Sequence, residues 1–300
     1  MTLKERIQNL ALSEGFTHCK VAKSTYLHEE EKILKQWLAD GNHADMDYLK
    51  NYTHLRVNPQ NIVAEAKSVI VLTQNYYPKQ HTENEQVPHI AYYARGCDYH
   101  KVIRKKLKRI ADYILRESKT LEIRYFIDSG PVLERTWAER AGVGWIGKNS
   151  MLINPQTGSY MFLSVIITQV ELESDSPLTD RCGTCTRCTN ACPTSAILDN
   201  RTIDARKCIS LHTQAPIHDT NKEYKLANQL LGCDICQKIC PWNRKPLATS
   251  EQEFDSHPEY FKLTRNDYFS MPEHQFNRIF DNKMLGNKGW KIFKRNIEKL

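Results

Sequence analysis

The segment 182–241 constrains the fold of this chain more than any other feature, because it contains eight of the ten cysteines. Its first part, from Cys182 to Pro193, has the spacing C-x2-C-x2-C-x3-C-P. This spacing is typical of bacterial ferredoxins with two [4Fe–4S] clusters, in which the fourth cysteine binds the other cluster of the pair. Its second part, from Cys233 to Pro241, repeats the spacing without the first cysteine, and Cys208 lies between the two parts.

The crossover of the fourth cysteine assigns these residues to two predicted [4Fe–4S] clusters. The ligands of the first are Cys182, Cys185, Cys188 and Cys240. The ligands of the second are Cys192, Cys208, Cys233 and Cys236. Cys208 completes the second set because it is the only other cysteine nearby.

Zinc and disulfides are the alternative uses of these cysteines. Zinc also accepts four thiolates, but its usual sites combine two separated C-x2-C pairs without the x3-C-P ending. Disulfides require an oxidising compartment, and the sequence carries no export signal. Iron–sulfur clusters are therefore the preferred interpretation.

Charge and hydropathy limit which binding partners and which cellular compartment are expected for this chain. The N-terminal residues, MTLKERIQNL, are charged and lack the apolar core of a signal peptide, and the apolar runs are too short to span a membrane. We therefore expect a cytoplasmic protein without a membrane partner. The net charge of +7 favours a polyanionic partner, with nucleic acid as the first candidate, although a merely basic surface is the alternative.

The pattern of apolar residues predicts a mixed fold of the α+β or α/β class. Helices are expected over 2–15, 29–39, 46–52, 99–118, 131–141, 204–213 and 222–231, and strands over 16–22, 68–75, 89–94, 122–127 and 161–168. The helix at 99–118 begins after Asp98, and Pro131 is expected at the first position of the next one. Residues 171–181 resemble a linker. The predicted domains are an α/β domain at 1–175, a ferredoxin-like domain at 176–245 and a basic helical extension at 246–300.

Two features of the first domain are candidates for a site. Asp128 ends a predicted strand, the position at which open α/β sheets bind ligands, although an aspartate there also caps helices. The loop 142–149 contains three glycines, which would let the backbone approach a large flat cofactor. Neither matches a dinucleotide fingerprint or a P-loop, so those nucleotide-binding interpretations are rejected.

Short motifs spread over residues 56–245 resemble the epoxyqueuosine reductase family of tRNA-modification enzymes. They are Asn75-Tyr76-Tyr77-Pro78, Tyr93-Ala94-Arg95-Gly96 with Asp98-Tyr99-His100, Asp128 with Pro131-Val132-Leu133-Glu134-Arg135, Gly144-Trp145-Ile146-Gly147-Lys148-Asn149, Cys208-Ile209-Ser210 and Gly232-Cys233-Asp234-Ile235-Cys236-Gln237 with Cys240-Pro241-Trp242-Asn243.

The resemblance implies a nitroreductase-like domain that binds cobalamin (B12), next to the clusters. It implies reductive removal of the epoxide oxygen of epoxyqueuosine at the wobble position of tRNA, which yields queuosine. Asp128 would donate a proton to the opening oxygen, and for this we expect burial against the corrin to raise its pKa. A reduced electron donor is required, which the sequence does not identify, and we expect a monomer.

The resemblance also suggests residues that contact the cofactor and the tRNA. The expected cobalamin contacts are Arg56, Cys97, Asp128, Leu152, Ser210 and Asp234. Longer family members carry additional C-terminal helical repeats, so here the tRNA contacts are expected in the core and in the basic tail. They are Lys148, Lys288, Lys291, Lys294 and Arg295.

Two other functions fit part of the sequence. A corrinoid reductase similar to reductive dehalogenases would share the clusters and the cobalamin but act on a small molecule. A ferredoxin-type electron-transfer module would need neither a corrin pocket nor Asp128.

Overall fold

A central four-stranded sheet organises the computed structural model, which describes residues 1–79, 86–118, 120–215, 226–256 and 258–300. The strand order is β1 (His18–Lys23), β2 (Ser68–Asn75), β7 (Met161–Thr168) and β4 (Ile123–Phe126). Every neighbouring pair is antiparallel, with Val71 opposite both Lys20 and Val165. The mixed class is confirmed, and its sheet is of the α+β type.

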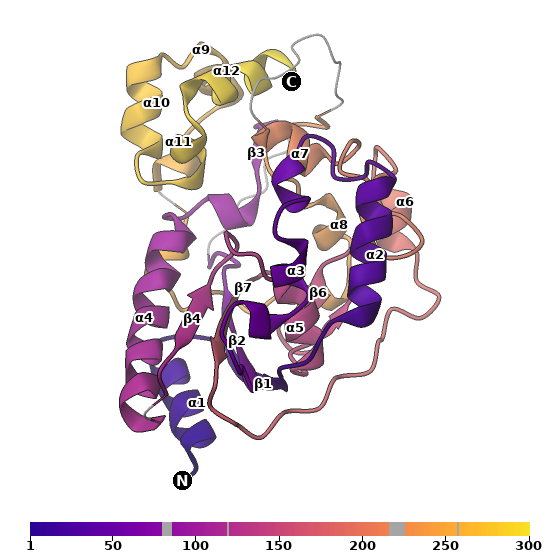
Figure 1. Cartoon of the computed structure of the whole chain (residues 1–300). Coiled ribbons are helices and arrows are strands. Elements are labelled where there is room, and N and C mark those ends of the chain that lie inside the picture. Colours follow the sequence, from indigo (N-terminus) through magenta and orange to yellow (C-terminus); the bar gives the residue numbers. More distant parts are fainter. Residues whose placement is uncertain (80–85, 119, 216–225, 257) are drawn as a thin grey trace.

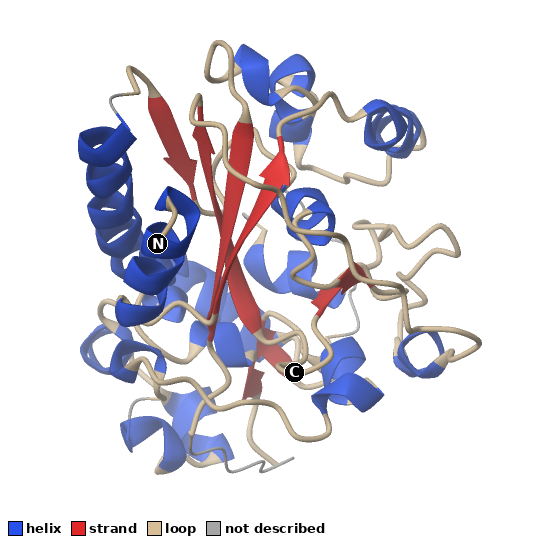
Figure 2. Cartoon of the chain, turned by 90° about the horizontal axis from the view of Figure 1, so that it is seen from below, coloured by secondary structure: helices blue, strands red, loops and turns tan. Residues whose placement is uncertain are grey.

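Side chains alternate between the two faces of the sheet along each strand, and both faces are buried. Ile70 and Leu72 of β2 join the hydrophobic core on one face, while Val69 and Val71 join the core on the other. Helices α1 (Leu3–Ser13) and α4 (Tyr99–Ser118) cover the first face, and α5 (Glu134–Arg140) packs on the second. Figure 2 shows the strands between these two helical layers.

The two helices of the first layer begin at residues that cap them. The side chains of Thr2 and Glu5 form a capping box at the start of α1, and Asp98 Oδ1 accepts the backbone N–H of His100 at the start of α4. The apolar stripe of α4, which includes Ile103 and Ile110, is buried as predicted. No described helix is long and apolar enough to cross a membrane.

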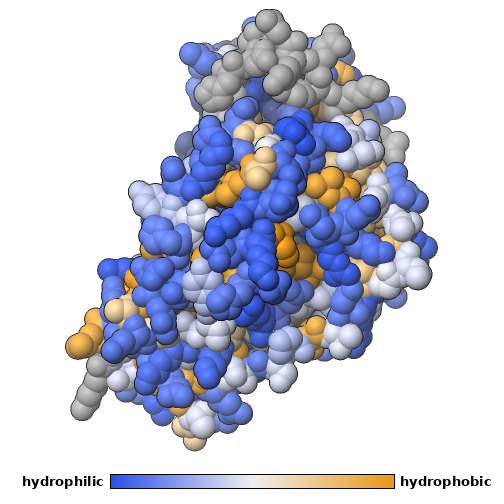
Figure 3. All heavy atoms as spheres, turned by 45° about the vertical axis from the view of Figure 1, so that its right-hand side comes forward, coloured by the Kyte–Doolittle hydropathy of each residue, from blue (hydrophilic) through white to orange (hydrophobic). Residues whose placement is uncertain are grey.

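Two further helices lie between β1 and β2, α2 (His28–Ala39) and α3 (Thr53–Arg56). The indole of Trp37 in α2 donates to the carbonyl of Ile203, which ties this helix to the cysteine-rich region. Seen from the side on which α2 lies, the surface is mostly hydrophilic, with hydrophobic side chains visible between polar ones (Figure 3).

The cysteine-rich region consists of short elements joined by loops (Figure 1). Its helices are α6 (Arg187–Ala191), α7 (Ile209–Gln214) and α8 (Ile235–Lys238). Its strand β8 (Gln229–Leu231) pairs in parallel with β3 (His89–Ile90), and a hairpin of β5 (Trp145–Ile146) and β6 (Leu152–Ile153) lies before it in the chain. Residues 171–181 are extended and tied down, because Asp175 accepts the N–H of Val21 and pairs with Lys4.

The C-terminal residues form α9 (Arg265–Ser270), α10 (Glu273–Phe280), α11 (Met284–Lys288) and α12 (Trp290–Glu298). Phe276, Phe280 and Phe293 from this tail belong to the same hydrophobic core as α4. Figure 1 shows the tail above the N-terminal end of α4. Backbone pairing between β3 and β8 also crosses the first predicted domain boundary, and the proposed division into three domains stays a prediction.

Several predicted elements differ from the structure. The stretch 89–94 is a strand only at β3 and continues as a 3-10 turn, and the helix expected from Pro131 begins at Glu134. The helix expected at 204–213 begins at Ile209. Of the helix expected at 222–231, residues 222–225 lie outside the described residues, and 229–231 form β8 because their backbone pairs with a distant strand.

Candidate active site

Asp128 lies in the loop that follows β4, with a left-handed backbone φ of 57°. Aspartate tolerates this conformation better than most residues, because its short polar side chain bonds to nearby groups. Its side chain is 68% exposed, so solvent or a ligand can reach the carboxylate. Because the sheet is antiparallel, the parallel-sheet rule does not account for this site.

Three residues at the start of α4 form a hydrogen-bonded relay with Asp128. The hydroxyl of Tyr99 donates to Asp128 Oδ2 at 2.8 Å, and His100 Nε2 lies 3.4 Å from the same oxygen. The other ring nitrogen of His100, Nδ1, lies 2.9 Å from Asp98 Oδ1. The rings of Tyr99 and His100 stack with a centroid separation of 4.0 Å. The histidine is thus held between two carboxylates.

These contacts determine which group in the relay carries the proton. The hydrogen bond with His100, followed by that from Tyr99, holds the pKa of Asp128 below its ordinary value although burial opposes the shift. Burial lowers the pKa of His100, but its hydrogen bonds with Asp128 and Asp98 outweigh this effect and raise that pKa. In the protein alone these contacts favour the charged forms of both side chains, the imidazolium and the carboxylate. The raised pKa expected for Asp128 concerns its burial against a bound corrin and stays a prediction.

Glu134, at the start of α5, is a second carboxyl near Asp128 that the sequence reasoning did not select. Burial, followed by the charge of Asp128, raises the pKa of Glu134 to about 8, although Arg135 and Arg56 oppose the shift. The guanidinium of Arg56 donates to the carbonyl of Gly130 at 3.4 Å, within the Asp128 loop. Predicted residue Arg56 therefore does lie at this site, and a largely neutral carboxyl accompanies it.

Tyr93 connects the relay to the cysteine-rich segment. Its ring lies against Gly232, where a Cβ atom would come within 2.8 Å of Tyr93 Cε1. Burial, followed by the charges of Asp234 and Asp128, raises the pKa of Tyr93, so this phenol lies near both carboxylates. Asp234 is itself buried and accepts the backbone N–H of Tyr92 at 2.8 Å. Tyr93 therefore lies between the Asp128 loop and the second cysteine run.

Cysteines of the predicted first set lie near one another, and their assignment to one cluster stays a prediction. Cys240 and Cys182 belong to one small apolar cluster with Trp145. Burial, followed by the charges of Cys182, Cys188 and Cys185, raises the pKa of Cys240. No three described metal-binding side chains surround a single point; in a cubane cluster each thiolate instead binds its own iron.

The second set shows the same pattern. Burial, with contributions from Asp234, Cys208 and Cys192, raises the pKa of Cys233 to about 12. Burial, followed by the charges of Cys233 and Cys208, also raises the pKa of Cys236. Metal binding supplies the positive charge that such crowded thiolates need. Cys208 therefore lies near the second run of cysteines, which lacks the first cysteine of the repeated spacing and so needs one more ligand.

The loop 142–149 supports the cysteine segment. The indole of Trp145 donates to Cys182 Sγ at 3.4 Å, Lys148 donates to the carbonyl of Cys185 at 2.9 Å, and Asn149 donates to that of Cys236 at 3.3 Å. Its glycines are needed because protein backbone approaches closely: a Cβ at Gly144 would come within 2.2 Å of the Ile153 oxygen. The glycines therefore serve packing between chain segments, and a direct approach to a cofactor does not explain them.

A network of buried amides fixes the second run to the sheet domain. Gln237 and Asn243 both donate to Ser159, just before β7. Gly158 has a φ of 75°, and a Cβ there would come within 2.2 Å of Asn243 Oδ1. These motif residues therefore have a structural role: they hold the cysteine-rich region in a fixed position on the sheet domain.

The remaining predicted cofactor contacts lie in different surroundings. Leu152 is buried in the core on the α5 side of the sheet, and the hydroxyl of Ser210 accepts from Gln214 within α7. Cys97 is partly exposed and accepts from Lys283 of the tail at 3.4 Å. These positions stay predictions.

The predicted tRNA contacts in the tail fall into two groups. Arg295 donates to the carbonyls of His212 and Ala215, so its guanidinium anchors α12 on α7. Lys291 and Lys294 are exposed on α12. The charge of Lys288 contributes to lowering the pKa of Asp128, which places this lysine near the relay.

Unpaired groups around Asp128 fit an additional polar ligand. In the described part of the chain, Arg56 Nε, Tyr93 Oη and Glu134 Oε1 are buried without a hydrogen-bond partner. Such groups are costly unless a ligand or water completes them. Cobalamin carries many amides that can pair with them, so the residues present fit this cofactor.

Fold and site together define a class, an α+β redox protein with a double iron–sulfur segment. A family model described as a 4Fe-4S double cluster binding domain matches residues 181–243, and one described as epoxyqueuosine reductase QueG, DUF1730, matches residues 56–129. The epoxyqueuosine reductase of Cellulophaga algicola is 39% identical, with 99% of each chain covered. That of Escherichia coli is 33% identical over 98% of this chain and 79% of its own. The chain therefore belongs to the epoxyqueuosine reductase family, an oxidoreductase family.

Solved structures agree with this assignment. A crystal structure of epoxyqueuosine reductase with an epoxyqueuosine-modified tRNA-Tyr stem loop has a TM-score of 0.85 and 28% identity, covering 98% of this chain and 80% of that one. A structure of the Bacillus subtilis enzyme, with a catalytic aspartate loop swung out of the active site, has a TM-score of 0.83 and 29% identity over the same shares. The predicted family is confirmed, and its cofactors are two [4Fe–4S] clusters and cobalamin.

Proposed function

We propose that this chain reduces epoxyqueuosine to queuosine at the wobble position of tRNA. The observation that carries the proposal is the Asp128 relay beside two sets of cysteines in a chain 39% identical to an epoxyqueuosine reductase over its length. A related structure contains the modified stem loop, which supports tRNA as the substrate. A small-molecule substrate or pure electron transfer would leave this similarity unexplained.

When bound, the clusters would supply single electrons and cobalamin would supply the reducing chemistry for the epoxide. The chain's own residues manage protons, since removal of the oxygen as water also consumes them. His100 Nε2 lies 3.4 Å from Asp128 Oδ2 and is positioned to pass a proton to it, and Tyr99 donates to the same oxygen. Asp128, exposed on its loop, passes this proton to the opening epoxide oxygen.

A loop position for Asp128 agrees with the Bacillus subtilis relative, whose catalytic aspartate loop swings out of its active site. The left-handed φ and the 68% exposure of Asp128 suit a loop with more than one position. We infer that the loop approaches the substrate when tRNA is bound.

The tRNA backbone is proposed to contact the exposed Lys291 and Lys294, with Lys288 as a further candidate nearer Asp128. Lys148, beside the first cysteine run, is another candidate contact. We propose that the reaction takes place in the cytoplasm, because its substrate is a tRNA. We further propose that the chain works as a monomer and takes electrons from a reduced donor protein, and that Arg56, Cys97, Leu152, Ser210 and Asp234 lie around the cofactor.

Anaerobic turnover of an epoxyqueuosine-containing tRNA stem loop tests the proposal. Protein loaded with both clusters is mixed with a chemical reductant, with or without cobalamin, and the nucleosides are measured by mass spectrometry. Queuosine is expected only when cobalamin is present. Fully loaded protein that binds the stem loop yet leaves epoxyqueuosine unchanged would contradict the assignment.

A further inference from the structure

The relay that holds Asp128 is completed by the C-terminal tail. The side-chain amide of Asn287, in α11, donates to Asp98 Oδ2 at 2.9 Å. The other oxygen of Asp98, Oδ1, faces His100 Nδ1 at 2.9 Å. One carboxylate therefore joins a residue almost two hundred positions away to the histidine beside Asp128.

Backbone contacts hold this part of the tail in register with the relay. The N–H of Asp98 donates to the carbonyl of Asn282 at 3.1 Å, and Cys97 forms an isolated antiparallel bridge with Lys283. Two consecutive residues of the core thus dock on two consecutive residues of the tail. Helix α11 follows directly after these two docked residues, and its Asn287 therefore reaches Asp98.

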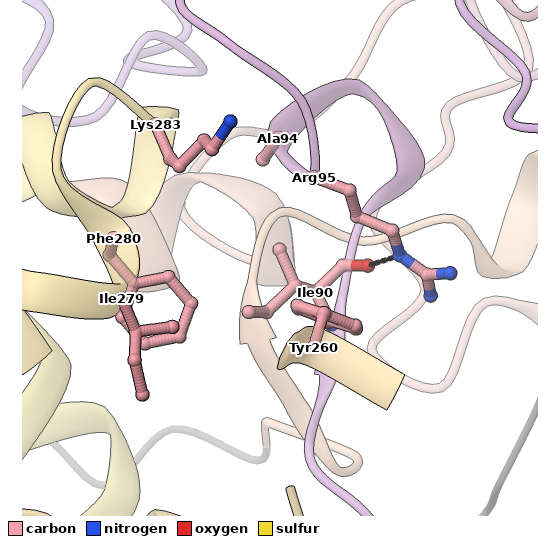
Figure 4. A pocket seen from close by; sticks show the side chains of 7 residues that line it. All are labelled: Ile90, Ala94, Arg95, Tyr260, Ile279, Phe280 and Lys283. Atoms are coloured by element: carbon pink, nitrogen blue, oxygen red, sulfur yellow. Dashed lines mark hydrogen bonds between the residues drawn. The ribbon is translucent and has the colours of Figure 1, made fainter. Parts of the chain in front are cut away.

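The interface between the tail and the core next to these contacts, here called the seam, is apolar and closely packed. Figure 4 shows Ile279 and Phe280 of α10 on one side of a narrow pocket, with Ile90 and Tyr260 on the other. Arg95 also lines this pocket, and its guanidinium donates to the carbonyl of Ile90 at 2.8 Å. The docking of the tail therefore rests on burial at this seam, and the exposed Asn287 is not needed for it.

We propose that Asn287 is a positioning residue of the proton relay, which orients the Asp98 carboxylate toward His100. Building on the proposed function, this makes the tail a part of the active site in addition to a surface for tRNA. The backbone N–H of His100 holds only Oδ1 of this carboxylate, and the amide of Asn287 adds a second point of attachment at Oδ2, so that Oδ1 stays directed at the imidazole. His100 is thereby fixed in the orientation that directs Nε2 at Asp128.

The charged and titratable groups around His100 come from the start of α4, from the loop after β4 and from α11. Asp98 precedes α4, Tyr99 stacks on the imidazole from α4 itself, and Asp128 follows β4. Lys288 contributes from α11 through its effect on Asp128. Loss of the Asn287 amide loosens one of the two carboxylates that favour the imidazolium, so the imidazolium is lost at lower pH.

The variant Asn287→Leu tests the proposal, because leucine has a similar size and no donor. The expected result is an approximately tenfold loss of kcat for epoxyqueuosine reduction with the KM for tRNA unchanged. The alkaline decline of kcat should move to lower pH. In nitrogen-15 NMR of histidine-labelled, cluster-loaded protein, the His100 signal, identified by its absence in His100→Gln, should titrate at lower pH.

Asn282→Gly is the matched control, because it keeps the carbonyl that receives the Asp98 N–H and suits the backbone φ of 57°. If Asn287→Leu behaves like this control in both kcat and the His100 titration, the positioning role is wrong. Asn287→Ala, which also removes the donor and places only a methyl group at this exposed position, replaces the leucine variant should that one fail to fold. Wild-type protein without turnover would contradict the proposed function, while the NMR titration would still decide the role of Asn287.

Discussion

His100 Nε2 lies 3.4 Å from Asp128 Oδ2, and this contact makes the two side chains one titrating pair. Hydrogen bonding lowers the pKa of Asp128, and the two carboxylates around His100 raise the pKa of the imidazole. Both shifts favour a proton on the histidine, and we propose that His100 supplies the proton for catalysis through Asp128.

The pH dependence of turnover should report this pair. Because the pKa of His100 is raised, its contribution to stability and to activity is present at low pH and lost as the pH rises through the folded-state value. His100→Gln should slow turnover roughly a hundredfold and remove the alkaline decline of kcat. His28→Gln, at the exposed start of α2, serves as the control. An unchanged pH profile in His100→Gln would exclude the histidine from the relay.

Glu134 should make the protein less stable at alkaline pH. Its folded-state pKa of about 8 lies above that of an ordinary carboxyl, so wild-type stability falls as the pH rises between the two values. Glu134→Gln removes this dependence, and its melting temperature should exceed that of the wild type more at pH ~9 than at pH ~6. The comparison uses cluster-loaded protein without added cobalamin, with the exposed Glu173→Gln as control. Equal differences at both pH values would mean that the carboxyl is not neutral in the folded state.

Cys208 should be needed for one cluster only. Cys208→Ala removes a predicted ligand of the second set, so iron content should fall from about eight to about four atoms per chain. Cys97→Ala removes a thiol outside both runs and should retain the full iron content. Anaerobic iron analysis and the absorbance of the clusters measure both. Full occupancy in Cys208→Ala would show that another group completes the second cluster.

The basic residues of the tail should separate into binding and structural roles. Lys291→Ala with Lys294→Ala should weaken tRNA binding and reduce its salt dependence by up to about one unit of slope per lost phosphate contact. Arg295→Ala should instead lower stability by about 2 kcal/mol, because its guanidinium donates to two carbonyls of the neighbouring segment. Binding isotherms at several salt concentrations and thermal unfolding distinguish the two. The assignment is wrong if the lysine variants retain the wild-type salt slope.

The sequence predicted those parts of the fold that local patterns determine. The bounds of β2 and β7 follow from apolar runs, and those of α4 from an apolar stripe behind a capping aspartate. The two cysteine sets, derived from ligand spacing, stay a prediction. Strand β8 was predicted as helix because its partner, β3, lies well over a hundred residues earlier in the chain. Local propensity does not record such a pairing.

The site was only partly predictable for the same reason. Asp128 was identified by its motif, but its pKa depends on His100, whose ring is brought to it by the packing of α4 against β4. The glycines of loop 142–149 were explained by a cofactor, whereas they accommodate the neighbouring backbone. Asn287 carried no sequence signal, since its role arises only from the docking of the tail.

Nucleoside analysis of tRNA from cells lacking this chain tests the central claim most directly. Without the chain, epoxyqueuosine should accumulate and queuosine should disappear. Wild-type protein should restore queuosine, whereas Asp128→Asn should not, although it should retain both clusters. Normal queuosine in cells without the chain, or full restoration by Asp128→Asn, would contradict the account.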